Sequence, residues 1–488
     1  MKTYILIFAI LLYRPVIAQN SFEVNYTGID NEFLIYTFET TKGDFISIGG
    51  KKGVSTPLPL SQLIVKISKY GEIINELVYT KPDTNFVLQY GYEKANGNYF
   101  LIGTLTDTVL PNDYNVTYVC ERAPDLSLVW EKFSAIPESY NNHRISNFII
   151  DADSNLFIQG SIDTVYSGYN YRLLTMIFDK NGNRLNINFY EGWKSPSSTN
   201  EMIFNFDSTA ICFIGNYVRN ELYTTEFIEM DLELNITDYI SVIDEEHFAV
   251  PPVTVKVFKN SNYIQANKAS MEPGTDQDLY IKIMDEELNT LRDTLLFYPE
   301  KIEIPSYIGM GFIDTNRIWV PTFQPEFNFI PGTEVFRFHI FDTNLNLIGL
   351  KEYGGDRRYW FNNMIVTSDG GCLLTGRIPD YNGSHKDNSY IIKVMPEDII
   401  THAEDTSFIN DKDVLVYPNP FDTEIRFQTV RKDLNLDLFD ITGKQVLSGN
   451  IFDHSESAFA TAGLIRGIYF YTIRDDNRII QSGKLIKK

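Results

Sequence analysis

Short apolar segments separated by polar turns run through most of the chain, and one pattern recurs. A strand-like segment, a tight polar turn and an apolar run lead to glycine or a substitute, first in DFISIGG at 44–50 and last in GCLLTGR at 371–377. The copies follow one another about every 55 residues. Seven copies are found, and the corresponding position in each is Gly49, Gly103, Gly160, Gly215, Asn267, Thr322 and Gly376. This period predicts repeated supersecondary units that bury their apolar faces against one another.

Each period divides into four strand-like segments, which in the second copy are 86–93, 99–105, 115–122 and 128–133. The turns between them are rich in Asn, Asp and Gly, residues that tolerate the positive φ of hairpin turns, as at 95–98 and 179–182. Four antiparallel strands repeated around an axis form the blade of a β-propeller. The sequence therefore predicts an all-β protein with a seven-bladed β-propeller over residues 19–395.

The last copy supplies only three strands, at 360–366, 372–378 and 389–394. A strand-like segment without a partner, Phe22 to Tyr26, precedes the first copy. We predict that this segment adds the fourth strand of the seventh blade, which closes the ring and removes its open edge.

The pattern changes near the C-terminus. Residues 396–413 are acidic and polar, which is typical of a linker. Short alternating segments follow over residues 414–488 and predict a small seven-stranded, Ig-like β-sandwich. Four ordered motif blocks lie within it, and they contain Tyr417, Pro418, Asn419, Pro420, Gly443, Gly467, Tyr469, Gly483 and Lys484.

These blocks resemble the type A C-terminal sorting domain of the type IX secretion system of certain Gram-negative bacteria. The resemblance implies that residues 414–488 are recognised by the outer-membrane translocon. In this family the domain is commonly removed and the remainder attached to surface lipopolysaccharide. An adhesive Ig-like module without a sorting role is the alternative.

The N-terminus has the features of a secretory signal peptide over residues 1–18. Lys2 precedes an apolar stretch from Tyr4 to Tyr13, and Val16-Ile17-Ala18 ends in a small residue suited to cleavage. This stretch is too short to anchor the chain in a bilayer, and no later run is long enough. The sequence predicts a protein without a transmembrane anchor, secreted or attached to the outer cell surface.

Composition narrows the function classes. The net charge of −22, from 42 basic and 64 acidic residues, argues against nucleic acid as a partner. The three cysteines and six histidines show no metal-binding or redox spacing, so we predict buried free thiols, no metal and no cofactor. No catalytic motif is present and no catalytic residue is predicted, although a carboxylate pair could be hidden among so many acidic residues.

The longer connections, between second and third strands and between blades, fall on one face of the predicted disc, and functional residues are often carried by such loops. Aromatic residues in them suit stacking on sugars or anchoring a protein. The predicted ligand-binding residues are Tyr140, Tyr166, Tyr169, Trp193, Phe327 and Tyr359. The alternative for each is packing beneath its own loop. The chain is thus predicted to bind a glycan or surface protein, with an extracellular polysaccharide hydrolase or lyase, or a structural spacer, as alternatives.

Overall fold

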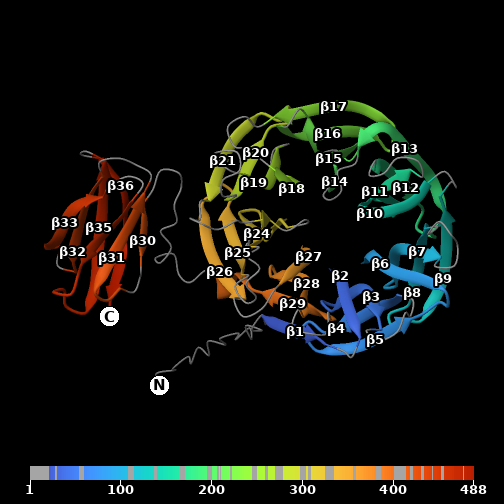
Figure 1. Ribbon diagram of the computed structural model, residues 1–488, viewed down its shortest axis with the longest axis horizontal. Helices are drawn as coiled ribbons and strands as arrows, with labels where there is room; N and C mark the ends of the chain where they lie inside the picture. The colour runs from blue at the N-terminus through green and yellow to red at the C-terminus, as the bar shows by residue number, and fades with distance from the viewer. Residues whose placement is uncertain are drawn as a thin grey trace, which may run out of the picture.

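The computed structural model shows two bodies, a ring of β-sheets and a smaller β-sandwich (Figure 1). The structure describes residues 21–27, 30–53, 60–107, 115–136, 140–164, 171–194, 201–205, 208, 210–219, 222–243, 250–258, 262–269, 278–296, 304–305, 309–324, 335–354, 359–380, 386–399, 414–417, 421–429, 434–441, 443–451, 455–475 and 478–488.

Over these residues the ring consists of seven antiparallel sheets, the blades. The strands of each blade are given in order from the inner to the outer strand (Figure 1). Blade 1 contains β2 (Asn31–Glu39), β3 (Phe45–Lys52), β4 (Ser61–Ile67) and β5 (Ile73–Tyr79). Blade 2 contains β6 (Thr84–Glu93), β7 (Tyr99–Asp107), β8 (Asn115–Arg122) and β9 (Leu128–Ala135). Blade 3 contains β10 (Tyr140–Ile150), β11 (Leu156–Thr164), β12 (Tyr171–Phe178) and β13 (Arg184–Lys194).

Blade 4 contains β14 (Glu201–Phe204), β15 (Ala210–Arg219), β16 (Leu222–Asp231) and β17 (Ile236–Ile243). Blade 5 contains β18 (Val250–Val257), β19 (Tyr263–Ala269), β20 (Asp278–Met284) and β21 (Thr290–Leu296). Blade 6 contains β22 (Ile304–Pro305), β23 (Gly311–Phe312), β24 (Arg317–Gln324), β25 (Val335–Asp342) and β26 (Leu347–Gly354), with β22 and β23 both pairing with β24. Blade 7 contains β27 (Trp360–Val366), β28 (Cys372–Asp380), β29 (Lys386–Val394) and β1 (Phe22–Tyr26).

The predicted closure of the ring is confirmed. The strand β1 pairs antiparallel with β29, from Phe22 opposite Lys393 to Tyr26 opposite Ser389. Val24 and Tyr26 are buried against blade 1, in a cluster that includes Leu34 of that blade. The N-terminal strand therefore supplies both the outer edge of blade 7 and part of its contact with blade 1.

The repeated glycine lies in the second strand of the blade, where the inner strand approaches it closely. In blade 2 the register between β6 and β7 shifts between Leu88 and Tyr90, so the inner strand carries a bulge. A Cβ atom at Gly103 would lie 1.9 Å from the carbonyl oxygen of Val87. Equivalent glycines of blades 1, 3 and 7 are as crowded, since a Cβ atom at Gly49, Gly160 or Gly376 would lie 1.9 to 2.2 Å from an inner-strand carbonyl oxygen.

The turns between third and fourth strands differ from the prediction that Asn, Asp and Gly supply their positive φ. Gly182 does so in blade 3, but leucine takes this conformation in four other blades, at Leu126, Leu234, Leu288 and Leu345. Each of these leucines is at most 7% exposed. Burial of the side chain offsets the cost of about 1–2 kcal/mol for the left-handed backbone.

An aspartate stabilises several of these turns. Asp342 accepts backbone N–H bonds from Asn344 and Asn346 through Oδ1, and the Asn346 amide donates to its Oδ2 at 2.8 Å. The same three bonds hold Asp231. They also hold Asp179. Both Asp179 carboxylate oxygens are thus engaged within the turn.

Neighbouring blades are joined on this turn face by side chains that reach across. The donors are outer-strand residues, and each acceptor is the carbonyl oxygen just before the residue with positive φ in the next blade. Asn75 donates to Asp125, Lys132 to Asn181, Asn186 to Glu233 and Arg292 to Asn344, over 2.6 to 3.2 Å. The same kind of hydrogen bond between neighbouring blades therefore recurs along the repeat.

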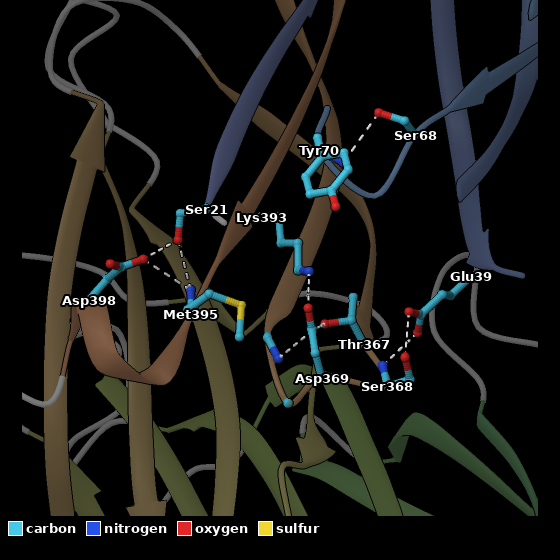
Figure 2. Close-up of polar contacts among 12 residues, drawn as sticks. Ser21, Glu39, Ser68, Tyr70, Thr367, Ser368, Asp369, Lys393, Met395 and Asp398 are labelled. Atoms are coloured by element: carbon cyan, nitrogen blue, oxygen red, sulfur yellow. Dashed lines mark hydrogen bonds and ion pairs between the residues drawn. The ribbon is translucent and has the colours of Figure 1, made fainter. Parts of the chain in front are cut away.

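At the closure of the ring the turn face carries charged contacts. Figure 2 shows the buried Lys393 ammonium paired with Asp369, which also accepts from the Thr367 hydroxyl at 2.5 Å. Glu39 of blade 1 accepts from the backbone N–H and hydroxyl of Ser368 at 2.6 and 2.7 Å. Burial alone would raise the pKa of Asp369, but the bonds from Lys393 and Thr367 lower it below the ordinary value.

Asp369→Asn should lower the thermal unfolding midpoint at pH 6, because the buried Lys393 loses its charged partner. A group with a lowered folded-state pKa contributes stability above its unfolded pKa, about 4, and loses it as the pH falls through the folded value. The gap between variant and wild type should therefore shrink below about pH 4. Differential scanning calorimetry across this range checks the prediction. The control is Asp153→Asn on an exposed turn of blade 3. A difference between Asp369→Asn and wild type that does not change with pH would contradict the prediction.

The smaller body is the predicted sandwich of seven strands. One sheet contains β30 (Leu415–Tyr417), β31 (Glu424–Thr429) and β34 (Ser455–Ala460). The other has the order β33 (Gln445–Ile451), β32 (Leu434–Asp440), β35 (Gly467–Asp475) and β36 (Arg478–Lys487). Inward side chains from both sheets, including Phe427, Leu436 and Tyr471, form one core. A short 3-10 helix, η2 (Pro396–Asp398), stands at the start of the predicted linker.

Candidate functional site

The structure describes only part of the predicted ligand-binding set. Tyr166, Tyr169 and Phe327 lie outside the described residues. Tyr140 begins β10 and Trp193 lies near the end of β13, and for both only the backbone is described. Tyr359 is described fully, so it is the one member of the set whose surroundings are known.

Tyr359 is buried, which favours the alternative that this residue packs in the protein. The residue is 9% exposed, and its ring centroid lies 5.2 Å from that of Phe336 and 5.3 Å from that of Tyr390. It belongs to the core cluster between blades 6 and 7. Tyr359 directly precedes β27, and its ring turns into an aromatic cluster that a single sequence does not show. The Tyr359 side chain therefore packs within this core cluster.

The next residue, Trp360, is not in the predicted set and is 42% exposed. It starts the inner strand of blade 7 and pairs with Arg377, whose guanidinium carbon lies 4.7 Å from the centroid of the indole. Successive residues of a strand point to opposite sides of the sheet. Two adjacent aromatic residues at the start of a strand therefore indicate that one faces the core and the other does not, and this was the signal available in the sequence. An exposed indole held by a cation stands at the loop end of blade 7.

Polar groups of blade 1 adjoin this pair. Arg377 pairs with Ser389, so both side chains lie on the same side of the sheet as Trp360. The Ser389 hydroxyl accepts from the backbone N–H of Leu34 at 2.8 Å and donates to the carbonyl oxygen of Glu32 at 3.1 Å. The three blade 7 side chains thus face blade 1.

The blade 1 side of this junction carries charge. The Lys51 ammonium lies 3.1 Å from the buried carboxylate of Glu32 and 3.6 Å from that of Asp30. Partial burial alone would lower the pKa of Lys51, but the hydrogen bond to Glu32 and the nearby carboxylates raise it above the ordinary value. We call Glu32, Lys51, Trp360, Arg377 and Ser389 the junction cluster. It combines an aromatic face with both signs of charge.

The histidine and cysteine side chains that the structure describes are buried. Burial lowers the pKa of His143 to about 4 and that of His339 to about 3, so both rings are neutral at ordinary pH. Cys120 and Cys372 are buried free thiols as predicted, and burial raises the pKa of Cys120 to about 11. Among the described side chains no group of three or more His, Cys, Asp or Glu could hold a metal ion.

Five of the sorting motif residues lie in the four-stranded sheet of the sandwich or in its turns. Gly443 takes a φ of +82° in the turn after β32, and Tyr469 of β35 pairs with Asp440 of β32. On the other side Gly467 pairs with Lys487 and Phe470 with Lys484. Gly483 lies in β36 and Tyr417 in β30, whereas Pro418, Asn419 and Pro420 lie outside the described residues.

The comparison with protein families decides the identity of this body. Residues 415–488 match the family described as Secretion system C-terminal sorting domain. The sandwich is a secretion system C-terminal sorting domain. The resemblance to the type IX family is thereby confirmed, and the chain is a secreted β-propeller protein that carries this sorting domain.

Among solved structures, the sorting-domain protein is similar to several proteins at low sequence identity. The alpha-L-arabinofuranosidase of Fusarium graminearum in complex with arabinobiose has 9% identity and a TM-score of 0.40, over 78% of this chain and 99% of that one. The alpha-L-arabinanase of Penicillium chrysogenum has 10% identity and a TM-score of 0.37, over 76% and 98%. The WD40 domain of SCAP from fission yeast has 10% and 0.36, over 77% and 87%.

No curated protein matches the chain. Within the described residues, no helix has the length and apolar character needed to cross a membrane.

Proposed function

We propose that the exported propeller binds a glycan on its loop face, and that the junction cluster is the described part of the site. The observation that carries the proposal is the exposed indole of Trp360, held by Arg377 at the start of an inner strand. Other exposed large apolar side chains of the described ring lie on outer strands or turns, among them Ile74, Val129 and Leu291.

An indole face suits the C–H face of a sugar ring, which is apolar and flat. The guanidinium of Arg377 lies near the ring and restricts the indole, so less conformational freedom is lost on binding. Lys51 and Arg377 supply hydrogen-bond donors and the more exposed Asp30 beside Lys51 supplies an acceptor, as sugar hydroxyls require. The junction cluster therefore offers stacking and polar recognition together.

A protein partner fits these residues less well. Specific protein interfaces bury about 1,200–2,000 Å² and centre on several clustered anchors. Among the described residues of this junction Trp360 is the one large aromatic that is exposed, and its neighbour Tyr359 is buried. A small polar ligand with one apolar face matches this arrangement.

Trp360→Ala should weaken glycan binding roughly 10- to 30-fold, from the loss of about 1.5–2 kcal/mol of stacking. The chain from residue 19 onward is screened against neutral and uronate-containing polysaccharides and then titrated by calorimetry. Phe133→Ala is the matched control, because Phe133 is 47% exposed and Lys81 lies 4.1 Å from its ring on an outer strand. Equal affinity of Trp360→Ala and wild type would overturn the junction cluster as the site.

The same titration with Trp193→Ala and Tyr169→Ala tests two further aromatics of the predicted set. If both leave the affinity unchanged, the site is confined to the junction cluster and the wider aromatic face is wrong.

A polysaccharide hydrolase or lyase is the second candidate, favoured by one observation. Asp30 and Glu32 both contact the Lys51 ammonium, so two carboxylates lie close together at the junction. Glycoside hydrolysis uses such a pair. Release of reducing or unsaturated ends from the screened polysaccharides, abolished by Glu32→Gln, would favour this candidate over binding alone.

A further inference from the structure

The sorting domain exposes large apolar side chains at one end. Ile441 is 72% exposed, Ile465 81%, Ile468 41% and Phe470 47%. Isolated surface hydrophobics need no explanation, but a contiguous exposed group marks an interaction site. Whether these four form one surface depends on the register of the sheet.

The register brings them together. Phe470 pairs with Phe439, and Ile468 pairs with Ile486. Ile441 follows the end of β32 directly, and Asp440 before it pairs with Tyr469. Ile465 lies in the turn that leads into β35. We call Ile441, Ile465, Ile468 and Phe470 the apolar end of the sheet.

These side chains are not part of the core. Along β35 the alternate residues Tyr469, Tyr471 and Ile473 point inward and are at most 5% exposed. Ile468 and Phe470 occupy the intervening positions and therefore lie on the outer side. The fold already has its core without them.

Charged side chains lie elsewhere on the described outer surface. Farther along the same sheet, Asp437 accepts from the Gln445 amide at 2.9 Å and lies 3.3 Å from Arg474. On the outer side of the other sheet Arg426 pairs with Glu424. Apolar exposure in the described part of this domain is thus concentrated at one end.

Residues of the sorting motif hold this end in place. The Tyr469 hydroxyl donates to the carbonyl oxygen of Ile465 at 2.6 Å, which fixes the turn before β35. Gly443 donates its N–H to the Asp440 carbonyl oxygen at 3.0 Å and takes the positive φ that closes the turn carrying Ile441. Two separate motif blocks therefore position two exposed isoleucines.

We propose that the apolar end is the surface by which the secretion system recognises this sorting domain, through an apolar groove on a protein of that system. A sorting domain has to be bound by a receptor, and this end offers preformed apolar area that the fold itself does not use. Exposed Lys444 and Arg466 flank it, so the groove has an acidic rim. The motif glycines and Tyr469 act as positioning residues.

The test is the double variant Ile465→Ser and Phe470→Ser in the full-length chain. Two lost anchors weaken receptor binding at least about tenfold. The variant is produced in a cell that has a type IX secretion system, and its share in the medium and on the cell surface is compared with the share retained in the periplasm. We expect export to fall at least about tenfold, with retention in the periplasm.

Two controls accompany the variant. Leu291→Ser makes the same kind of change at a 55% exposed leucine of blade 5 and should leave export unchanged. Ile465→Leu with Phe470→Tyr keeps large side chains and should restore export. Calorimetry of the purified variants checks that the sorting domain unfolds at the wild-type temperature, which is expected because both residues are exposed.

Four results would overturn the proposal. Normal export of the double variant would mean that the receptor does not use this end. A loss of export that the conservative pair does not restore would point to a structural defect. Sedimentation showing a wild-type dimer that the double variant converts to monomer would assign the apolar end to self-association, and binding of the wild type alone to lipid vesicles would assign it to a membrane.

Discussion

Val24→Asp should open the ring and lower the thermal unfolding midpoint of the propeller by roughly 5–10 °C. Val24 is 7% exposed and lies in the cluster between blades 7 and 1, with Leu34, Phe45 and Ile391. A carboxylate placed in this apolar cluster costs about 4 kcal/mol or more. The strand would leave β29, whose edge then becomes free.

The neighbouring residue provides the control. Asn25 is exposed on the other side of the same strand and pairs with Tyr390, so Asn25→Asp should leave the midpoint within the error of calorimetry. Both variants are compared in the chain from residue 19 onward, and exposure of the β29 edge is followed by concentration-dependent aggregation. If Val24→Asp unfolds at the wild-type temperature, closure by β1 does not stabilise the ring.

Gly103→Ala should be as damaging, although it adds one methyl group. The Cβ atom would lie 1.9 Å from the carbonyl oxygen of Val87 and 2.9 Å from the Cα atom of Leu88, both backbone atoms that cannot rotate away. The bulge of β6 must shift, which disturbs the contacts that this inner strand makes with blade 1. We expect a loss of about 4 kcal/mol or more.

Gly97→Ala separates this effect from that of positive φ. Gly97 has a φ of +82°, and a Cβ atom added to it would meet no other atom within 4 Å. Alanine there therefore costs only about 1–2 kcal/mol of backbone strain. Thermal unfolding of the two variants side by side checks the difference. Equal losses would show that the close approach of β6 and β7 is not what requires glycine.

The ring could be predicted because the contact that requires glycine recurs from blade to blade. Gly49, Gly103, Gly160 and Gly376 are spaced regularly since each stands opposite an inner-strand carbonyl, and that contact has to be repeated in every such blade. The extra strand Phe22 to Tyr26 could be assigned because the seventh copy lacked a strand. Sequence blocks of the sorting domain were similarly informative, since glycines and a tyrosine fix its turns.

The site was harder to predict, because side-chain direction at the start of a strand depends on tertiary packing. Tyr359 and Trp360 are adjacent and aromatic, and only the cluster around Phe336 determines which of them is buried. Leucine at positive φ was missed for the same reason. Local preference favours glycine or asparagine there, but a buried position for Leu345 outweighs it.

The pairing of β1 with β29 also has a mechanical consequence. The chain leaves the ring from β29 toward the sorting domain, so tension applied at the C-terminal end is carried first by this strand. It is hydrogen-bonded along both edges, by β28 on one side and by β1 on the other. A pulled strand flanked in this way must break two ladders to come out, whereas an edge strand must break one. The first residues of the folded chain thereby resist force applied to its last.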